Sequence, residues 1–303
     1  MADRKGSVGI ILNPAAGRGK AVQFRDRLEK IALESGTSFL WRESEAPAHA
    51  TTLAKEMMKE GYRTIVGCGG DGTINEIGSA LAGHSEVNFG IVPLGMGNDF
   101  IRSAGIPRDP EAAFRLILSG NYSVIHSDCG KVDGHYFFNN LGIGFDGAVV
   151  VTAQKVNHMK NPYYAGVARH LLTYSTFAAH IRSDKKARMS EPIFMFVASI
   201  GKAYGGGFYI TPDARLDDGL MDVVVVPGTN HFARPWLLYL VSRKKHLKHK
   251  GFRFFRSKDV ELDLYDKVID AHVDGIRITV SGKVHVELIP GALSVITAKE
   301  GNK

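Results

Sequence analysis

The sequence predicts an α/β N-terminal domain, whose parallel sheet has helices on both faces, followed by a β-rich antiparallel C-terminal domain. Three observations predict this class. The chain has 303 residues, which at roughly 100–200 residues per domain favours two domains. Up to about residue 126, short apolar runs alternate with helical stretches, which is typical of parallel strands. Beyond that residue, strand-like runs are separated mainly by turns, which is typical of antiparallel sheet.

The elements of the first domain follow from its apolar pattern. Short apolar runs predict four strands, at Val8–Leu12, Ser38–Trp41, Thr64–Cys68 and Phe89–Pro93. Amphipathic stretches predict four helices, at Ala21–Glu34, Ala48–Glu60, Thr73–Leu81 and Pro110–Ser119. Because helices alternate with the strands, the chain has the crossover connections that parallel pairing requires.

The second domain contains more strands and fewer helices. Its expected strands are Tyr136–Asn140, Ile193–Ile200, Leu220–Val226, Lys258–Leu264, Val268–Val273 and Val284–Ile289. One or two helices fit within residues 145–180, and one within residues 231–247. No internal repeat or low-complexity linker marks the boundary, so the change of pattern alone places it.

Composition excludes several classes of protein. Hydrophobic residues make up 44% and charged residues 23%, which excludes a disordered or fibrous chain. Lys and Arg number 38 against 31 Asp and Glu, and this excess favours an anionic partner, namely nucleotide, membrane surface or nucleic acid. No nucleic-acid recognition motif accompanies it. Cys68 and Cys129 are too few for a disulfide framework, and no apolar run approaches the roughly 20 residues that span a bilayer, so we expect a cytoplasmic protein.

Three glycine-rich loops each follow a predicted strand of the first domain directly. They are residues 13–20 (NPAAGRGK), 69–73 (GGDGT) and 93–99 (PLGMGND). Carboxyl ends of parallel strands meet at one edge of a sheet, where glycine loops and a helix N-terminus can bind phosphate. The alternative is that each loop is a tight turn that needs positive φ. The first loop is not a Walker A sequence, because Ala21 follows Lys20, and it lacks the dinucleotide fingerprint.

Together the loops resemble the catalytic domain of diacylglycerol kinase-like lipid kinases, the bacterial group related to sphingosine and ceramide kinases. The motifs that carry the resemblance in this domain are Asn13-Pro14 with Gly17, residues 69–76 (GGDGTINE) and residues 95–100 (GMGNDF). The GGDGT stretch is shared with NAD kinases and phosphofructokinases, whereas its continuation and the Gly97-Asn98-Asp99 loop are more specific. Further motifs follow at Asp128-x-Gly130, residues 139–146 (NNLGIGFD), residues 212–220 (PDARLDDGL) and Val273-Asp274-Gly275.

The resemblance covers nearly the whole chain and implies its domain organisation. It implies an ATP-binding catalytic domain over residues 1–126, completed by a closing strand at about 291–303. It also implies a β-rich lipid-binding domain over residues 127–290, with the active site in the cleft between the domains.

The resemblance also implies residue roles. The implied ATP contacts are Asn13, Pro14, Ala15, Ala16, Gly17, Ser44, Gly69, Gly70, Asp71, Gly72, Thr73, Asn75, Glu76, Gly95, Met96, Gly97, Asn98 and Asp99. Asp71 is assigned to the catalytic centre, and the alternative is an N-cap of the helix that begins near Thr73. Asp274 is a second candidate base, and the alternative is an Asp-Gly hairpin turn. Ile276 stands where many relatives carry a glutamate base, and Met96 where many carry threonine.

A structural Mg²⁺ site is implied in the segment 215–220 (RLDDGL). It would use the Asp218 carboxylate with the carbonyl oxygens of Arg215 and Leu220, and Asp128 would link the metal to the active site through water. Hard oxygen ligands suit Mg²⁺. The alternative is a surface turn, because adjacent acids before a glycine are common there.

The function implied is transfer of the ATP γ-phosphoryl group to a hydroxyl of a diacylglycerol-like or sphingoid-like lipid. Two alternatives stay open: a nucleotide-binding regulatory protein with weak or lost kinase activity, suggested by Ile276 and Met96, and a soluble-metabolite kinase of the NAD kinase type. The segment Arg243–Lys258 has eight Lys or Arg and no acid, so we expect peripheral binding to anionic membranes. A solvated helix end is the alternative there, and a homodimer stays open.

Overall fold

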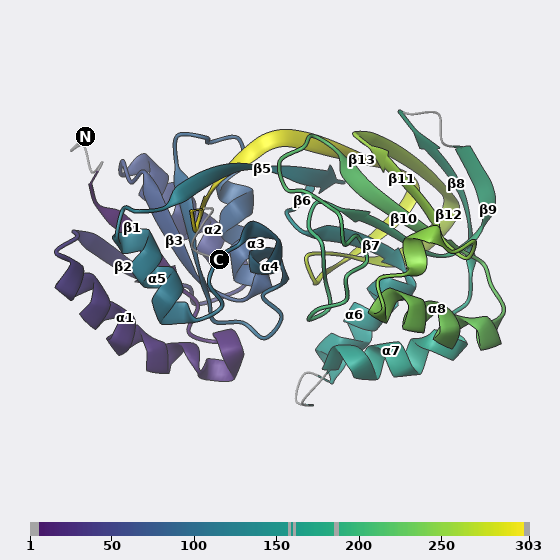
Figure 1. Ribbon diagram of the computed structural model, residues 1–303, viewed down its shortest axis with the longest axis horizontal. Helices are drawn as coiled ribbons and strands as arrows, with labels where there is room; N and C mark the ends of the chain where they lie inside the picture. Colours follow the sequence, from purple (N-terminus) through teal and green to yellow (C-terminus); the bar gives the residue numbers. More distant parts are fainter. Residues whose placement is uncertain (1–5, 157–158, 160–161, 185–187, 300–303) are drawn as a thin grey trace. The chain divides into compact units, whose positions relative to one another are not determined.

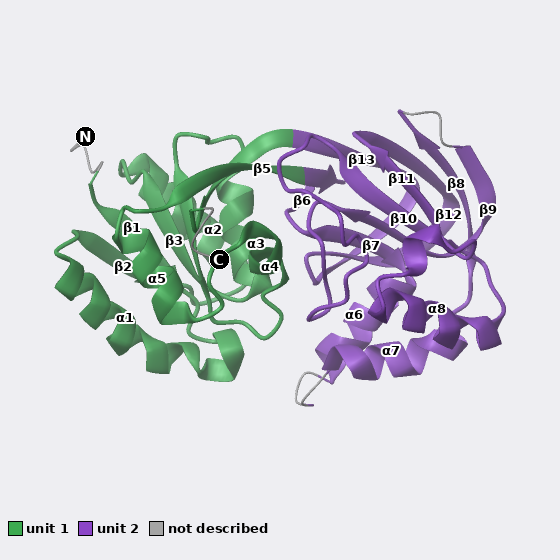
Figure 2. Cartoon of the chain, viewed as in Figure 1, with its two compact units in different colours: residues 1–129, 290–303 green, residues 130–289 purple. Residues whose placement is uncertain are grey.

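The computed structural model describes residues 6–156, 159, 162–184 and 188–299. The chain forms two compact units, shown in two colours in Figure 2: unit 1 contains residues 1–129 and 290–303, and unit 2 contains residues 130–289. Each unit has its own hydrophobic core. Within the described residues, no helix is long and apolar enough to cross a membrane.

A parallel sheet with the strand order β2-β1-β3-β4 forms the centre of unit 1 (Figure 1). The strands are β1 (Val8–Leu12), β2 (Phe39–Glu43), β3 (Thr64–Gly69) and β4 (Asn88–Pro93). All four lie within two residues of the apolar runs that predicted them. The end of β13 (Ile276–Thr297) extends the sheet, because its residues 294–295 pair in parallel with the start of β4.

Five α-helices belong to the described part of unit 1: α1 (Ala21–Ser35), α2 (His49–Lys59), α3 (Asp71–Leu81), α4 (Asp99–Ala104) and α5 (Pro110–Leu118). Four of them were predicted, and α4 was not. A short 3₁₀ turn, η1 (Ala16–Gly19), lies in the first glycine-rich loop.

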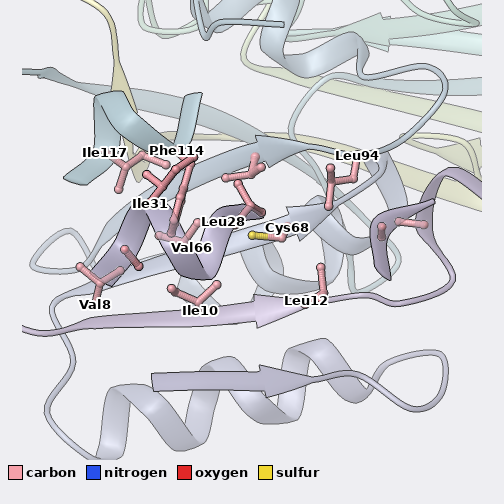
Figure 3. Packing of buried hydrophobic residues seen from close by; sticks show 14 of the residues in the cluster. Val8, Ile10, Leu12, Leu28, Ile31, Val66, Cys68, Leu94, Phe114 and Ile117 are labelled. Atoms are coloured by element: carbon pink, nitrogen blue, oxygen red, sulfur yellow. The ribbon is translucent and has the colours of Figure 1, made fainter. Parts of the chain in front are cut away.

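The helices of unit 1 cover both faces of its sheet. Figure 3 shows one face, where side chains of α1 and α5 pack against β1 and β3; those labelled there include Leu28, Ile31, Phe114, Ile117, Ile10 and Val66. The other face carries α2 and α3, since a Cβ placed on Gly9 would lie 2.6 Å from Met57 Sδ. Successive residues of a strand point to opposite faces, so each strand supplies both helical layers.

Unit 2 is built on an antiparallel sheet with the order β11-β10-β9-β7-β12-β13. Strand β5 (Ser123–Val132) leads from unit 1 into unit 2. The strands that follow are β6 (His135–Phe137), β7 (Asn140–Gly144), β8 (Phe177–Ser183), β9 (Arg188–Ser199), β10 (Met221–Pro227), β11 (Arg253–Ser257) and β12 (Asp259–Val273).

Three α-helices within the described part of unit 2 pack on this sheet: α6 (Phe145–Lys155), α7 (Pro162–Thr173) and α8 (Arg234–Ser242). Two 3₁₀ turns, η2 (His231–Ala233) and η3 (His246–Lys248), flank α8. The apolar core of the unit combines residues of these helices with residues of β9 and β10. The chain therefore has an α/β N-terminal unit and a β-rich C-terminal unit.

Five strand predictions were wrong in extent. Tyr136–Asn140 is two strands, because Phe138 and the residue after it leave the ladder and donate their N–H groups to a carboxylate. The runs 258–264 and 268–273 are one strand, β12, whose register shifts between Asp263 and Val268. The run 284–289 and the closing strand expected at about 291–303 likewise belong to the single strand β13.

Candidate active site

The three glycine-rich loops lie together at the carboxyl edge of the parallel sheet. Leu12 is in register with Cys68, and Gly69 with Pro93, so the loops leave neighbouring strands at the same level. Backbone hydrogen bonds extend the ladder beyond the strands: Asn13 N donates to Cys68 O at 3.0 Å, and Leu94 N donates to Gly69 O at 2.8 Å.

Asn13 joins the first loop to the second. Its Nδ2 donates to Thr73 Oγ1 at 2.8 Å, and its Oδ1 accepts the N–H of Ala15 at 3.0 Å. Gly17 has φ +59°, and a Cβ on it would lie 2.6 Å from Leu94 O. Only glycine satisfies both the positive φ and the close approach to the third loop.

The second and third loops pack backbone against backbone. A Cβ on Gly95 would lie 2.4 Å from the Cα of Gly70, and one on Gly70 would lie 3.1 Å from the Cα of Gly95. Asn98 then closes the third loop on itself, because its Oδ1 accepts the N–H of Gly95 at 3.1 Å and its Nδ2 donates to Gly95 O at 2.8 Å. The loops therefore form one tightly packed backbone surface.

Asp71 holds this surface together. It is the first residue of α3, and its carboxylate accepts two backbone N–H groups of the third loop: Asn98 N donates to Oδ2 and Asp99 N to Oδ1, both at 2.8 Å. The N-cap of α3 is Gly70, without a side-chain hydrogen bond. Asp71 is therefore one residue inside α3, and its carboxylate binds the N-terminus of α4.

Several other implied ATP contacts have structural partners of their own. Glu76 Oε2 accepts the N–H of Ala50 at 3.3 Å, and Glu76 O accepts from Thr51 Oγ1 at 2.9 Å, so this residue holds the start of α2. Ser44 lies just beyond β2, where its N–H donates to Leu12 O at 2.9 Å. Met96 is well exposed in the third loop, whereas Asn75 is buried in α3.

Asp274 lies in unit 2 and forms the turn between β12 and β13. It and Gly275 have φ of +49° and +81°, which is the type I′ geometry favoured by Asp-Gly. The turn alternative is therefore confirmed. The carboxylate also accepts three backbone N–H groups from the β6–β7 connection: Phe138 at 2.8 Å on Oδ2, and Asn139 and Asn140 at 2.9 Å on Oδ1.

Behind this turn, Asp146 of the motif at residues 139–146 forms a polar chain with two residues that no motif indicated, Tyr163 and His272. His272 Nδ1 accepts the N–H of Gly275 at 3.2 Å, so the ring proton is on Nε2, which donates to Asp146 Oδ2 at 2.8 Å. Tyr163 donates its hydroxyl proton to Asp146 Oδ1 at 2.9 Å. Burial, followed by the nearby Asp146 charge, raises the pKa of Tyr163 well above its ordinary value.

Asp218, the implied Mg²⁺ ligand, lies near a second carboxylate, Asp222, and both are paired with Arg256. Its Oδ2 accepts from Arg256, while Oδ1 is buried and has no hydrogen-bond partner among the described residues. Arg256 Nε also lies 3.4 Å from Asp222 Oδ2, and burial raises the pKa of Asp222 to about 6. Asp128 is buried in unit 1, where its Oδ1 accepts the N–H of Gly291 at 2.8 Å.

An apolar pocket lies within unit 2. It is a half-open hollow between the sheet and helices α6, α7 and α8. Its lining is almost entirely apolar and aromatic, with Leu237, Leu238 and Val241 contributed by α8. The Arg234 guanidinium is also in the lining, stacked 4.3 Å from the Phe194 ring, while its Nη1 donates to the carbonyl of Leu171 at 3.1 Å. Such a pocket suits a hydrocarbon chain.

The chain thus combines a parallel sheet that has three glycine-rich loops at its carboxyl edge with a β-rich unit that contains an apolar pocket. Residues 7–132 match the family model of the diacylglycerol kinase catalytic domain. Residues 139–297 match that of the YegS C-terminal NAD kinase beta sandwich-like domain. The second match covers more than half of the chain, so the chain belongs to the diacylglycerol kinase-like family that these two models define.

Relatives and solved structures agree with this family. The chain is 36% identical over 202 residues to a Pseudomonas aeruginosa protein named probable lipid kinase YegS-like, which is 64% of each chain. It is 27% identical over 274 residues to the diacylglycerol kinase of Staphylococcus carnosus, covering 88% of this chain and 87% of the relative. A solved structure from Bacillus anthracis has a TM-score of 0.80 at 22% identity, covering 97% and 98%, which shows the shared fold.

Proposed function

We propose that the protein is an ATP-dependent lipid kinase that phosphorylates a hydroxyl of a diacylglycerol-like or sphingoid-like lipid. The observation that carries the proposal is the single backbone surface formed by three glycine-rich loops, which Asn13, Asp71 and Asn98 connect, at the carboxyl edge of a parallel sheet. The names of the relatives support the same activity.

ATP is proposed to bind with its phosphates along these loops, in contact with the residues that the family resemblance implies. Phosphoryl transfer depends mainly on positioning and on neutralising charge, and the close packing of Gly17, Gly70 and Gly95 keeps backbone N–H groups accessible to phosphate oxygens. In the reaction, the lipid hydroxyl loses its proton to a base, its oxygen bonds to the γ-phosphorus, and the bond to the β–γ bridging oxygen breaks to release ADP. Asp71 and Asp274 are the two candidate bases.

Unit 2 is proposed to bind the lipid, with the apolar pocket between α6, α7, α8 and the sheet holding a hydrocarbon chain. Each buried methylene of such a chain would contribute about 0.8 kcal/mol. The lining of the pocket contains no acidic side chain, so it suits the hydrocarbon chains of diacylglycerols and of sphingoid bases equally. The pocket therefore indicates the class of substrate but not its headgroup.

The test is transfer of label from [γ-³²P]ATP to a panel of diacylglycerols, sphingoid bases and NAD. Label in the organic phase is expected. Label retained in the aqueous phase with NAD would support a soluble-metabolite kinase instead. Binding of ATP without transfer to any acceptor would support the regulatory alternative, which Ile276 and Met96 motivate because many relatives carry glutamate and threonine at these positions.

A structural Mg²⁺ is proposed at Asp218, with the carbonyl oxygens of Arg215 and Leu220. The fit rests on the buried, unpartnered Asp218 Oδ1 beside a second carboxylate, Asp222. No three His, Cys, Asp or Glu side chains in the described part of the chain gather to hold a metal. The bound ion would supply positive charge that stabilises this turn.

Asp218→Ala should therefore abolish stabilisation by Mg²⁺. In the parent, added Mg²⁺ should raise the melting temperature, because an ion that binds only the folded state stabilises it by RT ln(1 + [Mg]/Kd). Asp217→Ala is the matched control, since that exposed neighbour pairs with Arg215 at the surface. The measurement is melting temperature against Mg²⁺ concentration, and an equal response of Asp218→Ala and parent would discard the site.

Peripheral binding to anionic membranes is proposed through the segment Arg243–Lys258. Arg253 and Arg256 lie on β11 and pair with Glu191 and with Asp218, so the cations free to face a membrane are concentrated in residues 243–250. Four exposed lysines lie there: Lys244, Lys245, Lys248 and Lys250. Each cation near an anionic surface contributes on the order of 1 kcal/mol.

Replacing these four lysines with Gln should abolish sedimentation with anionic vesicles at physiological salt. Binding by the parent should fall steeply as salt rises, because screening acts over about 8 Å under these conditions. A control with the same change in net charge replaces four exposed lysines elsewhere: Lys30, Lys55, Lys59 and Lys267. Equal loss of binding in both variants would show that net charge matters and the segment does not.

A further inference from the structure

Helix α8 and the turn before it present large aromatic side chains to solvent. Phe232 is 90% exposed, Trp236 54% and Tyr239 51%. Trp236 and Tyr239 are three residues apart and therefore lie on one side of α8, while Phe232 lies in the preceding 3₁₀ turn η2. The rings of Trp236 and Tyr239 stack with their centroids 5.3 Å apart. Three exposed aromatic residues within eight residues of the chain are unusual for a surface that faces only water.

The opposite side of α8 is apolar as well. Leu237, Leu240 and Val241 are buried in the core of unit 2, and two of these also line the apolar pocket. A helix at an ordinary protein surface is polar on its outer side. Because α8 is apolar around nearly its whole circumference, its outer side requires an apolar neighbour.

The neighbouring helix enlarges the exposed surface. Leu172, at the end of α7, is half exposed, and its carbonyl oxygen lies 2.5 Å from His231 Nδ1, next to Phe232. We name the set Leu172, Phe232, Trp236 and Tyr239 the aromatic face.

Charge identifies the kind of surface that fits the aromatic face. No Asp or Glu occurs between Asp222 and Asp259, and Arg243, Lys244 and Lys245 directly follow α8. Lys244 Nζ lies 3.7 Å from the Tyr209 ring. Trp and Tyr concentrate at the level of lipid headgroups, and nearby cations attract anionic lipids. Charge complementarity thus favours a bilayer.

We propose that the aromatic face inserts into the headgroup region of an anionic phospholipid bilayer. The proposal rests on the proposed lipid kinase function, and it adds an apolar contact to the electrostatic one. Its consequence follows from the two sides of α8: the outer side would contact lipid while the inner side lines the pocket that is proposed to hold the hydrocarbon chain. A lipid substrate could then leave the bilayer along α8 with little exposure of its chain to water.

Tryptophan fluorescence tests the insertion directly. The chain has two tryptophans, and Trp41 belongs to the unit 1 core, packed against Phe114. Trp41→Phe leaves Trp236 as the sole reporter. With vesicles that contain phosphatidylglycerol, we expect a blue shift and quenching by lipids brominated near the headgroup, since interfacial helices insert about 5–10 Å. Unchanged emission at saturating vesicle concentration would overturn the proposal.

A variant with Phe232, Trp236 and Tyr239 all replaced by Ser should bind these vesicles at least about tenfold more weakly, including at high salt. The control replaces the exposed apolar residues Leu33 and Val268 with Ser and should bind as the parent does. Circular dichroism and the melting temperature check that both variants are folded.

Two further measurements distinguish failure of the insertion proposal from failure of the proposed lipid kinase function. Phosphorylation of a monomeric short-chain lipid should be unchanged in the triple variant, so loss of vesicle binding alone supports insertion, whereas a parent without lipid kinase activity refutes the proposed function independently. Light scattering tests the other occupant, a second copy of this chain. If the triple substitution converts a dimer to a monomer and leaves vesicle binding intact, the aromatic face is a protein interface and insertion is refuted.

Discussion

Asp71→Asn is expected to reduce lipid phosphorylation by about 10²–10⁴ while the protein remains folded. An asparagine has the shape of the aspartate but only one acceptor oxygen. Because both carboxylate oxygens of Asp71 accept backbone N–H groups of the third loop, the new amide would point an N–H₂ group at either Asn98 N or Asp99 N. The loop must then move away from the position in which it packs on Gly70.

Kinetics separate the two roles that Asp71 can have. If Asp71 is the base, kcat falls for every acceptor and KM for ATP changes little. If it only anchors the third loop, KM for ATP rises and kcat is better preserved. The measurement is a full set of initial rates against ATP and lipid, and activity within about threefold of the parent would end both assignments.

Asp109→Asn is a matched control for this substitution. Asp109 also lies in unit 1 and also accepts a backbone N–H at a helix N-terminus, that of Ala112 at 2.8 Å, where α5 begins. Asparagine is as good an N-cap as aspartate, so this change should leave both stability and activity close to the parent values.

Much of unit 1 could be predicted because its signals are local. Val8–Leu12 is buried at every residue and was predicted as a strand with the bounds that β1 has. Helix α4 could not be predicted, since the groups that fix its start are not adjacent in the sequence: its first N–H groups are bound by Asp71, 27 and 28 residues earlier. Asn98 is an N-cap by residue type, but it has left-handed φ and its side chain bonds Gly95 instead of the helix.

In the candidate site, too, features with a local signal could be predicted, and features that depend on contacts distant in the sequence could not. Because each loop directly follows a predicted parallel strand, the sequence predicted that the three loops share one edge of the sheet, and the register of β1, β3 and β4 places them there. The sequence could not show that Glu76 holds the start of α2, because that contact depends on how two helices pack. Asp146 ends the motif at residues 139–146, but its contacts with Tyr163 and His272 join two helices and a strand, so no spacing could indicate them.

Substitution of Asp274 should affect both stability and activity, and the two effects can be separated. In Asp274→Ala, three backbone N–H groups between Phe138 and Asn140 lose their acceptor. Each buried donor without a partner costs about 1–3 kcal/mol, so the melting temperature should fall clearly. Lipid phosphorylation should fall by about 10²–10⁴ if Asp274 accepts the proton of the lipid hydroxyl.

The Asn variant distinguishes the base from the structural acceptor. In Asp274→Asn, one oxygen can still accept from Asn139 and Asn140, while Phe138 N loses its acceptor and faces the new N–H₂ group, so stability should fall less than in Asp274→Ala. A smaller loss of stability than in Asp274→Ala together with an equally reduced kcat would identify Asp274 as the base. Activity that falls only in proportion to stability in both variants would instead show that the residue acts by holding the β6–β7 connection, and Asp71 would be the remaining candidate.

The chain offers a control with the same turn. Asp133 and Gly134 connect β5 to β6 and have φ of +45° and +81°, the same type I′ geometry as Asp274 and Gly275. Asp133 is exposed, so Asp133→Ala changes the turn residue without removing a buried acceptor. It should lose a small amount of stability and no activity. Since both aspartates occupy left-handed turn positions, any additional effect at Asp274 is attributable to what its carboxylate binds and to the chemistry it performs.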